Sequence, residues 1–93
     1  IAINPKTSEL ILTDIKSEAI QVMENIKAVL TEAKMSFENV VKTSVFLTDM
    51  NNFSTVNEVY GSYFIKDFPA RETVQVSKLP KNVNVEISVI AVR

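Results

Sequence analysis

The chain has 93 residues, enough for one domain with a modest core, and its 46% hydrophobic content argues against disorder. Ten basic and eleven acidic side chains give a net charge of −1, which disfavours a nucleic-acid binder working through a basic face. Because histidine and cysteine are absent, the chain cannot form disulfides, and zinc sites or histidine-assisted nucleophiles are disfavoured. A single glycine excludes a Gly-rich phosphate loop, and no apolar run approaches the ~20 residues of a membrane span.

The first segment, residues 1–13, begins without an initiator methionine, and we expect this start to be a fragment boundary. It carries the turn signature Asn4-Pro5-Lys6-Thr7, followed by the short apolar run Leu10-Ile11-Leu12. This pattern predicts a first strand. Thr13 or Asp14 then offers an N-cap for the element that follows.

A long amphipathic helix is predicted at residues 14–34. Its apolar residues recur every three or four positions, as expected for a helix with one core-facing stripe. These residues are Ile15, Ala19, Val22, Ile26, Val29 and Ala33, with Met23 and Leu30 widening the stripe. Charged residues, namely Lys16, Glu18, Glu24, Lys27 and Glu32, fall largely on the opposite side. We therefore expect this helix to cover one face of a sheet.

The middle of the chain predicts a strand followed by a second helix. Residues 40–47 are rich in β-branched side chains, which favour a strand. Asp49, Asn51 and Asn52 can cap a helix at about residues 52–65, in which the apolar and aromatic residues again form one stripe. That stripe contains Phe53, Val56, Val59, Tyr60, Tyr63 and Phe64, and we interpret it as core rather than as a cofactor site. Pro69 blocks any further helix.

Two strands are predicted at residues 70–78 and 83–92, which completes the order β–α–β–α–β–β. This order predicts a two-layer α+β sandwich with both helices on one face of a mixed β-sheet. By period-two alternation, we expect a second, more polar face to carry Arg71 and Glu86. Because Ile90 and Val92 share that face, we expect it to be half-apolar and to be covered by a second subunit.

Arg71 and Glu86 are the residues best placed for recognising an anion and moving a proton in a chain without histidine or cysteine. A glutamate inside an otherwise apolar strand needs a partner or a function, because carboxylates are rarely buried alone. Each candidate site residue also has a non-functional interpretation. Arg71 would otherwise be a surface arginine, Glu86 an exposed carboxylate or structural ion pair, and Asn57 a polar helix position near a turn.

Motifs along the whole chain resemble one known family. They are Asn4-Pro5-Lys6-Thr7, Val41-Lys42-Thr43-Ser44-Val45-Phe46-Leu47-Thr48-Asp49-Met50, Phe53-x-x-Val56-Asn57-x-x-Tyr60, Pro69-Ala70-Arg71-x-x-Val74-x-Val76-x-x-Leu79-Pro80 and Val85-Glu86-Ile87-x-x-Ile90-Ala91. In this order they resemble the reactive intermediate deaminase family (RidA, also called YjgF). The resemblance implies a chorismate-mutase-like fold, a homotrimer with clefts between subunits, and a cytoplasmic setting with a mitochondrial copy left open.

The resemblance also implies an activity and its residues. Members hydrolyse enamines and imines such as 2-aminoacrylate and 2-iminobutanoate to 2-keto acids and ammonia, with no cofactor or metal. The family's carboxylate-clamping arginine corresponds to Arg71, and its water-orienting acidic residue corresponds to Glu86. The cleft asparagine corresponds to Asn57, and the position two beyond the arginine is Thr73, whose backbone carbonyl could contact the imine.

The sequence also departs from the family pattern. Members carry two strands before the Asn-Pro segment, and Ala2 and Ser8 stand where proline and glycine are common. We therefore expect residues 1–93 to form a single domain that is incomplete at its N-terminus. Two other functions remain open: an endoribonuclease or translation inhibitor, and a non-catalytic trimeric binder of small carboxylates.

Overall fold

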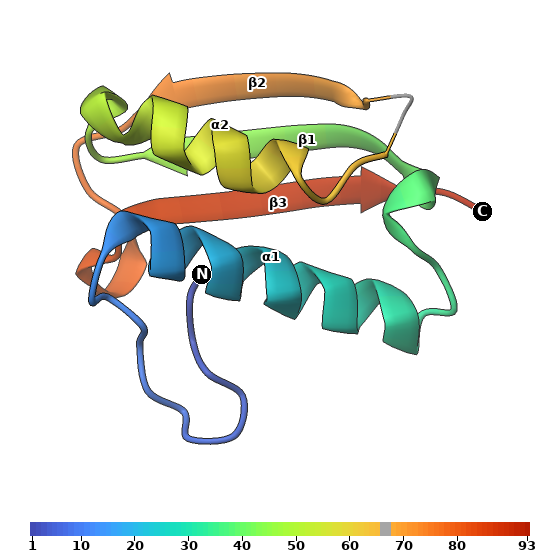
Figure 1. Cartoon of the computed structure of the whole chain (residues 1–93), viewed down its shortest axis with the longest axis horizontal. Coiled ribbons are helices and arrows are strands. Elements are labelled where there is room, and N and C mark those ends of the chain that lie inside the picture. The colour runs from blue at the N-terminus through green and yellow to red at the C-terminus, as the bar shows by residue number, and fades with distance from the viewer. Residues whose placement is uncertain (66–67) are drawn as a thin grey trace.

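The computed structural model of the protein describes residues 1–65 and 68–93 and has the two layers that the sequence predicts (Figure 1). Both helices pack on one face of a three-stranded sheet; they are α1 (Ile15–Glu32) and α2 (Phe53–Gly61). The strands are β1 (Val40–Leu47), β2 (Ala70–Gln75) and β3 (Val85–Ala91). Short 3-10 helices span Phe37–Asn39, Met50–Asn52 and Pro80–Asn82. Among these described helices, none is long and apolar enough to cross a membrane.

Strand β1 lies at the centre of the sheet, with the strand order β2-β1-β3. It pairs in parallel with β2 and antiparallel with β3, so the predicted mixed sheet is confirmed. Parallel neighbours need a crossover, and α2 supplies it between β1 and β2. This connection places α2 on the sheet face that α1 also covers (Figure 1).

The predicted first strand is wrong. Within residues 1–13 the structure has only an isolated bridge between Ile3 and Leu10, so the described elements run α–β–α–β–β. The segment is held instead by α1, because the Asn25 side-chain amide donates to the carbonyls of Ile1 and Ile3 at 3.2 and 2.8 Å. Ala2, which lies between these two residues in the chain, is completely buried and belongs to the core.

The predicted element boundaries are closest where a local signal defines them. Asp14 caps α1 by accepting from the Ser17 backbone at 2.7 Å, and β1 has the predicted bounds. Helix α2 ends at Gly61, well before Pro69, and β2 and β3 are shorter than predicted. The β2–β3 connection turns sharply instead, with Lys81 and Asn82 both at positive φ.

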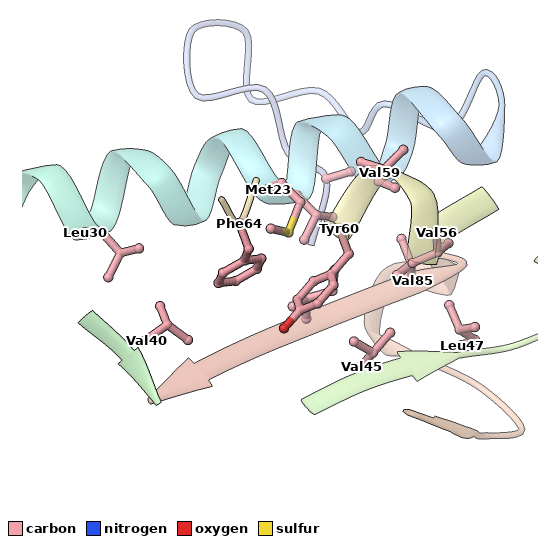
Figure 2. Close-up of a cluster of buried hydrophobic side chains, with 14 residues drawn as sticks. Met23, Leu30, Val40, Val45, Leu47, Val56, Val59, Tyr60, Phe64 and Val85 are labelled. Atoms are coloured by element: carbon pink, nitrogen blue, oxygen red, sulfur yellow. The ribbon is translucent and has the colours of Figure 1, made fainter. Parts of the chain in front are cut away.

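The core fills the space between the helices and the inner face of the sheet (Figure 2). Its labelled members are Met23 and Leu30 from α1, Val56, Val59 and Tyr60 from α2, Phe64, and Val40, Val45, Leu47 and Val85 from the strands. Burying an aliphatic side chain of this size contributes about 1.5–3 kcal/mol to folding. The predicted stripe of α1 is confirmed except at Val29, which is 69% exposed.

Glu18 is the main departure from the predicted polarity of α1, because it is completely buried rather than on the polar face. Its carboxylate accepts from the backbone N–H of Asn84 at 2.8 Å and of Val85 at 3.1 Å, and from the Asn84 side chain at 2.8 Å. Three donors and the positive end of the α1 dipole satisfy the buried charge. Glu18 thus fastens the first turn of α1 to the start of β3.

We expect Glu18→Ala to lower the free energy of unfolding by about 3 kcal/mol, because it leaves buried N–H groups without an acceptor. Glu32→Ala, at an exposed position of the same helix, is the control and should be close to neutral. Urea denaturation measures both. Equal effects of the two substitutions would show that the Glu18 bonds do not stabilise the fold.

Tyr63, just after the end of α2, makes a further polar contact with α1. Its hydroxyl donates to Glu24 on α1 at 2.7 Å. Burial, reinforced by the hydrogen bond and the charge of Glu24, raises the pKa of Tyr63 from 10.0 to about 12. Because the pKa is higher in the folded state, folding favours the protonated phenol of Tyr63. The protonated phenol therefore contributes its full stabilisation at any pH below the pKa of the unfolded chain.

We therefore expect stability to decline as pH rises from 10 to about 12, the interval between the unfolded and folded pKa values of Tyr63. The Tyr63→Phe variant should lose this part of the alkaline dependence. Chemical denaturation across this pH range, paired with an absorbance titration of the phenols, provides the measurement. An identical alkaline profile in the variant would contradict the assignment.

Candidate functional site

Arg71 lies on the helix-covered side of the sheet. It is paired with Thr43, and Thr73 is paired with Val45. Directly paired residues point to the same face of a sheet, and both β1 partners are buried beneath the helices. The expectation that Arg71 lies on the outer polar face is therefore wrong, because the register with β1 fixes the opposite orientation.

Helix α2 supplies three side chains around the guanidinium of Arg71. Nη1 of Arg71 donates to Oδ1 of Asn57. The central guanidinium carbon lies 5.6 Å from the centre of the Phe53 ring and 5.2 Å from that of Tyr60. Residues 53, 57 and 60 are spaced four and three apart, so they share one face of the helix. We call Phe53, Asn57 and Tyr60 the α2 cradle.

The charge of Arg71 has no acidic partner among the described residues, where the one ion pair joins Lys42 and Glu72. Arg71 is nevertheless exposed at the edge strand β2. A guanidinium has five N–H donors, and Asn57 takes one of them. The remaining donors can bind an external anion, for which carboxylate has the matching geometry.

Glu86 lies on the other face of the sheet. It is paired with Phe46, whose neighbours Val45 and Leu47 point into the core. The Glu86 side chain is half-buried and makes no hydrogen bond or ion pair with the residues that the structure describes. A carboxylate in this position remains available for a group outside the chain.

Arg71 and Glu86 are therefore not brought together within one chain. Strands β2 and β3 flank β1, which separates their axes by roughly 10 Å. Arg71 is level with Thr43 whereas Glu86 is level with Phe46, a displacement of roughly 10 Å along the strands. With the two side chains on opposite faces, one small molecule cannot contact both in a single copy.

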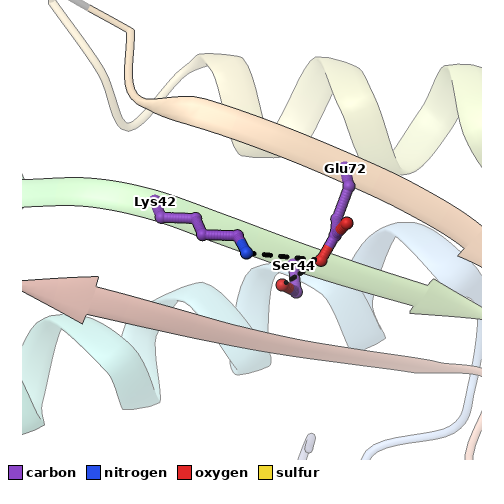
Figure 3. A network of polar contacts seen from close by, with 3 residues as sticks. All are labelled: Lys42, Ser44 and Glu72. Carbon is purple, nitrogen blue, oxygen red and sulfur yellow. Dashed lines mark hydrogen bonds and ion pairs between the residues drawn. The ribbon is translucent and has the colours of Figure 1, made fainter.

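The outer face of the sheet carries a polar network within an apolar surround. Lys42 Nζ lies 3.8 Å from Glu72 Oε1, and the Ser44 hydroxyl donates to the same oxygen at 2.9 Å (Figure 3). Beside this network Val74 is 42% exposed and Ile90 is 56% exposed. The expectation of a half-apolar second face is thus confirmed, although Arg71 is not on it.

Sequence reasoning missed Phe53 and Tyr60 as neighbours of the site because it assigned the α2 aromatics to the core. Tyr60 is indeed core, being 3% exposed, yet its ring also faces Arg71. The only available signal was the spacing of both rings from Asn57 on the helix.

A separate hollow of about 560 Å³ lies between α1 and α2, lined by Lys16, Glu58 and Tyr63 among others. None of the predicted site residues lines it. Among the described residues, no three acidic side chains gather closely enough to hold a metal ion.

Comparison with known proteins places this geometry in a family. The sequence profile described as Endoribonuclease L-PSP matches residues 1–93. A RutC family protein of Pyrococcus horikoshii is 52% identical over 98% of this chain and 72% of its own length. The 2-iminobutanoate/2-iminopropanoate deaminase of Escherichia coli is 44% identical over 100% of this chain and 74% of its own length.

Solved structures agree with the sequence match. The crystal structure of E. coli TdcF with bound serine has a TM-score of 0.94 and 42% identity, covering 100% of this chain and 75% of that one. Together these matches confirm the resemblance to the RidA/YjgF proteins that the motifs predicted. This chain belongs to the Endoribonuclease L-PSP family.

Proposed function

We propose that the protein hydrolyses small enamine and imine acids of the 2-aminoacrylate and 2-iminobutanoate class to 2-keto acids and ammonia. The observation that carries this proposal is the exposed guanidinium of Arg71, held by the α2 cradle and without an acidic partner among the described residues. Such a group is pre-organised for the carboxylate that every substrate of this class carries. The E. coli relative named as a 2-iminobutanoate/2-iminopropanoate deaminase supports the reaction type.

In the proposed reaction, Arg71 binds the substrate carboxylate and the Thr73 backbone carbonyl accepts from the imine N–H. Glu86 takes a proton from water as the water oxygen bonds to the imine carbon. The imine nitrogen gains both protons of that water, one of them returned by Glu86, the carbon–nitrogen bond breaks, and ammonia leaves. The former water oxygen becomes the keto oxygen, so one imine acid and one water give one keto acid and one ammonia.

The proposal requires two copies of the chain at each site, because Arg71 and Glu86 lie on opposite faces of the sheet. We propose a homotrimer in which one copy supplies Arg71, Asn57 and Thr73, and its neighbour supplies Glu86. The partly apolar outer face supports this assembly, since Val74 and Ile90 would be removed from water in it.

The family description favours one second candidate, cleavage of RNA. A net charge of −1 and the absence of histidine oppose it, because RNA binding needs cationic groups and ribonucleases commonly use imidazole for proton transfer. A third possibility is a trimer that binds small carboxylates without turning them over. It would use the same Arg71 guanidinium to bind the carboxylate, and it would differ from the deaminase only in having no catalytic turnover.

We expect the protein to accelerate ammonia release from 2-iminobutanoate generated in situ by a threonine dehydratase. Arg71→Ala should reduce kcat/KM at least about 100-fold, because a charge-assisted bidentate contact contributes about 3 kcal/mol. Arg71→Lys should recover little of this loss, since an ammonium cannot form the fork. Lys78→Ala, at an exposed loop position, is the matched control.

Undiminished acceleration by Arg71→Ala would exclude the carboxylate clamp. Saturable binding of 2-oxobutanoate without acceleration would select the non-catalytic binder. RNA cleavage that persists through repurification and disappears in Arg71→Ala would select the ribonuclease.

The shared site is tested by mixing two inactive variants. Arg71→Ala and Glu86→Gln should each be inactive, whereas subunits unfolded together and refolded as mixed trimers should regain activity. Random mixing leaves about one quarter of sites with both residues intact. Recovery near this level in the deaminase assay supports a site built from two copies. A mixture no more active than the separate variants would place both residues' functions within one chain.

A further inference from the structure

We propose that Tyr60 is a positioning residue for Arg71, and that the buried hydrogen bond between the Tyr60 and Thr43 hydroxyls holds its ring in place. This inference rests on the proposed function, because it assigns a role in binding the substrate carboxylate. It concerns residues that lie beneath the candidate site and that no comparison above assigns to it.

Tyr60 is anchored at both ends. Its backbone belongs to α2, and its ring points from that helix toward the sheet (Figure 2). At the far end the Tyr60 hydroxyl donates to Oγ1 of Thr43 at 3.1 Å. Tyr60 is 3% exposed and Thr43 is completely buried, so neither hydroxyl has water as an alternative partner. The ring therefore has one defined position.

Tyr60, Thr43 and Arg71 are each in contact with the other two. Thr43 is the direct partner of Arg71 in the β1–β2 ladder, so the register fixes the backbone of Arg71 beside it. The Thr43 hydroxyl holds the Tyr60 hydroxyl, and the Tyr60 ring lies 5.2 Å below the guanidinium carbon of Arg71. Both the base and the tip of the Arg71 side chain are thus located by the same buried pair.

Such positioning has a clear chemical benefit. A free arginine side chain loses most of its rotamer entropy when a ligand immobilises it. An aromatic ring orders the guanidinium through a cation–π contact without neutralising its charge, as an acidic partner would. The ring also excludes water from one face of the guanidinium, which strengthens hydrogen bonds at its edge. Ordering before binding therefore raises affinity for a carboxylate.

The alternative is that Tyr60 only fills the core. The two roles predict different kinetics. Loss of packing alone lowers stability and leaves the KM of the folded protein unchanged. Loss of positioning raises KM, because the substrate must then order Arg71 itself, while kcat changes little.

The decisive variants are Tyr60→Leu, which removes the ring, and the double variant Tyr60→Phe/Thr43→Val, which removes both hydroxyls. Replacing both partners of a buried hydrogen bond by apolar groups of similar shape costs little stability, so the double variant should fold. Phe37→Leu is the control, since Phe37 belongs to the same aromatic cluster through Tyr63 and Phe64 but makes no aromatic contact with Tyr60.

We expect Tyr60→Leu to raise KM for the imine acid about tenfold, in line with a desolvated cation–π contact, with kcat within about twofold of the unsubstituted protein. The double variant should raise KM by a few-fold, and Phe37→Leu should leave KM unchanged despite a lower melting temperature. If KM stays unchanged in both Tyr60 variants, the inference is overturned.

A second readout does not depend on catalysis. The NMR signal of the Arg71 Nε–H should be shifted by the Tyr60 ring and show restricted motion, and both features should disappear in Tyr60→Leu. An unsubstituted protein without deaminase activity would overturn the proposed function, whereas an Arg71 signal indifferent to Tyr60 would overturn the inference alone.

Discussion

The parallel pairing of β1 with β2 is the constraint on which the candidate site depends. Its register places Arg71 beside Thr43 and turns the arginine toward α2 rather than toward the outer face. A shift by one residue would send Arg71 to the opposite face and separate it from Asn57. The crossover helix that makes a parallel pair possible is also the element that supplies the α2 cradle. Fold and site therefore share one connection.

Two buried polar contacts relate the helices to the sheet. Glu18 holds α1 against the start of β3 by accepting from the backbone of Asn84 and Val85. Glu86 is the next residue of that strand and faces outward. Tyr60 holds α2 against β1 through Thr43. Both contacts are buried and directional, so each fixes the position of its helix on the sheet. The second contact lies beneath Arg71, the residue proposed to bind the substrate carboxylate.

The division of the proposed site between copies follows from sheet geometry. Alternate residues of a strand face opposite sides, so an arginine that faces the helices cannot share a small ligand with a glutamate that faces outward. The outer face holds the Lys42–Ser44–Glu72 network among exposed apolar side chains. A face of this kind suits contact with another copy, with its polar centre limiting the geometries that fit.

The sequence by itself determined the two helices, the central strand and the layer architecture, because apolar periodicity and the Asp14 cap are local signals. It also singled out Arg71, Glu86, Asn57 and Thr73, through residue chemistry and family motifs. Only the tertiary structure decided which face each residue occupies, since alternation within a strand shows two faces without showing which one the helices cover. Burial of Glu18 and the contact of the Tyr60 ring with Arg71 were likewise decided there, because the residues that hold Glu18 and Tyr60, Asn84 and Thr43, are distant in sequence.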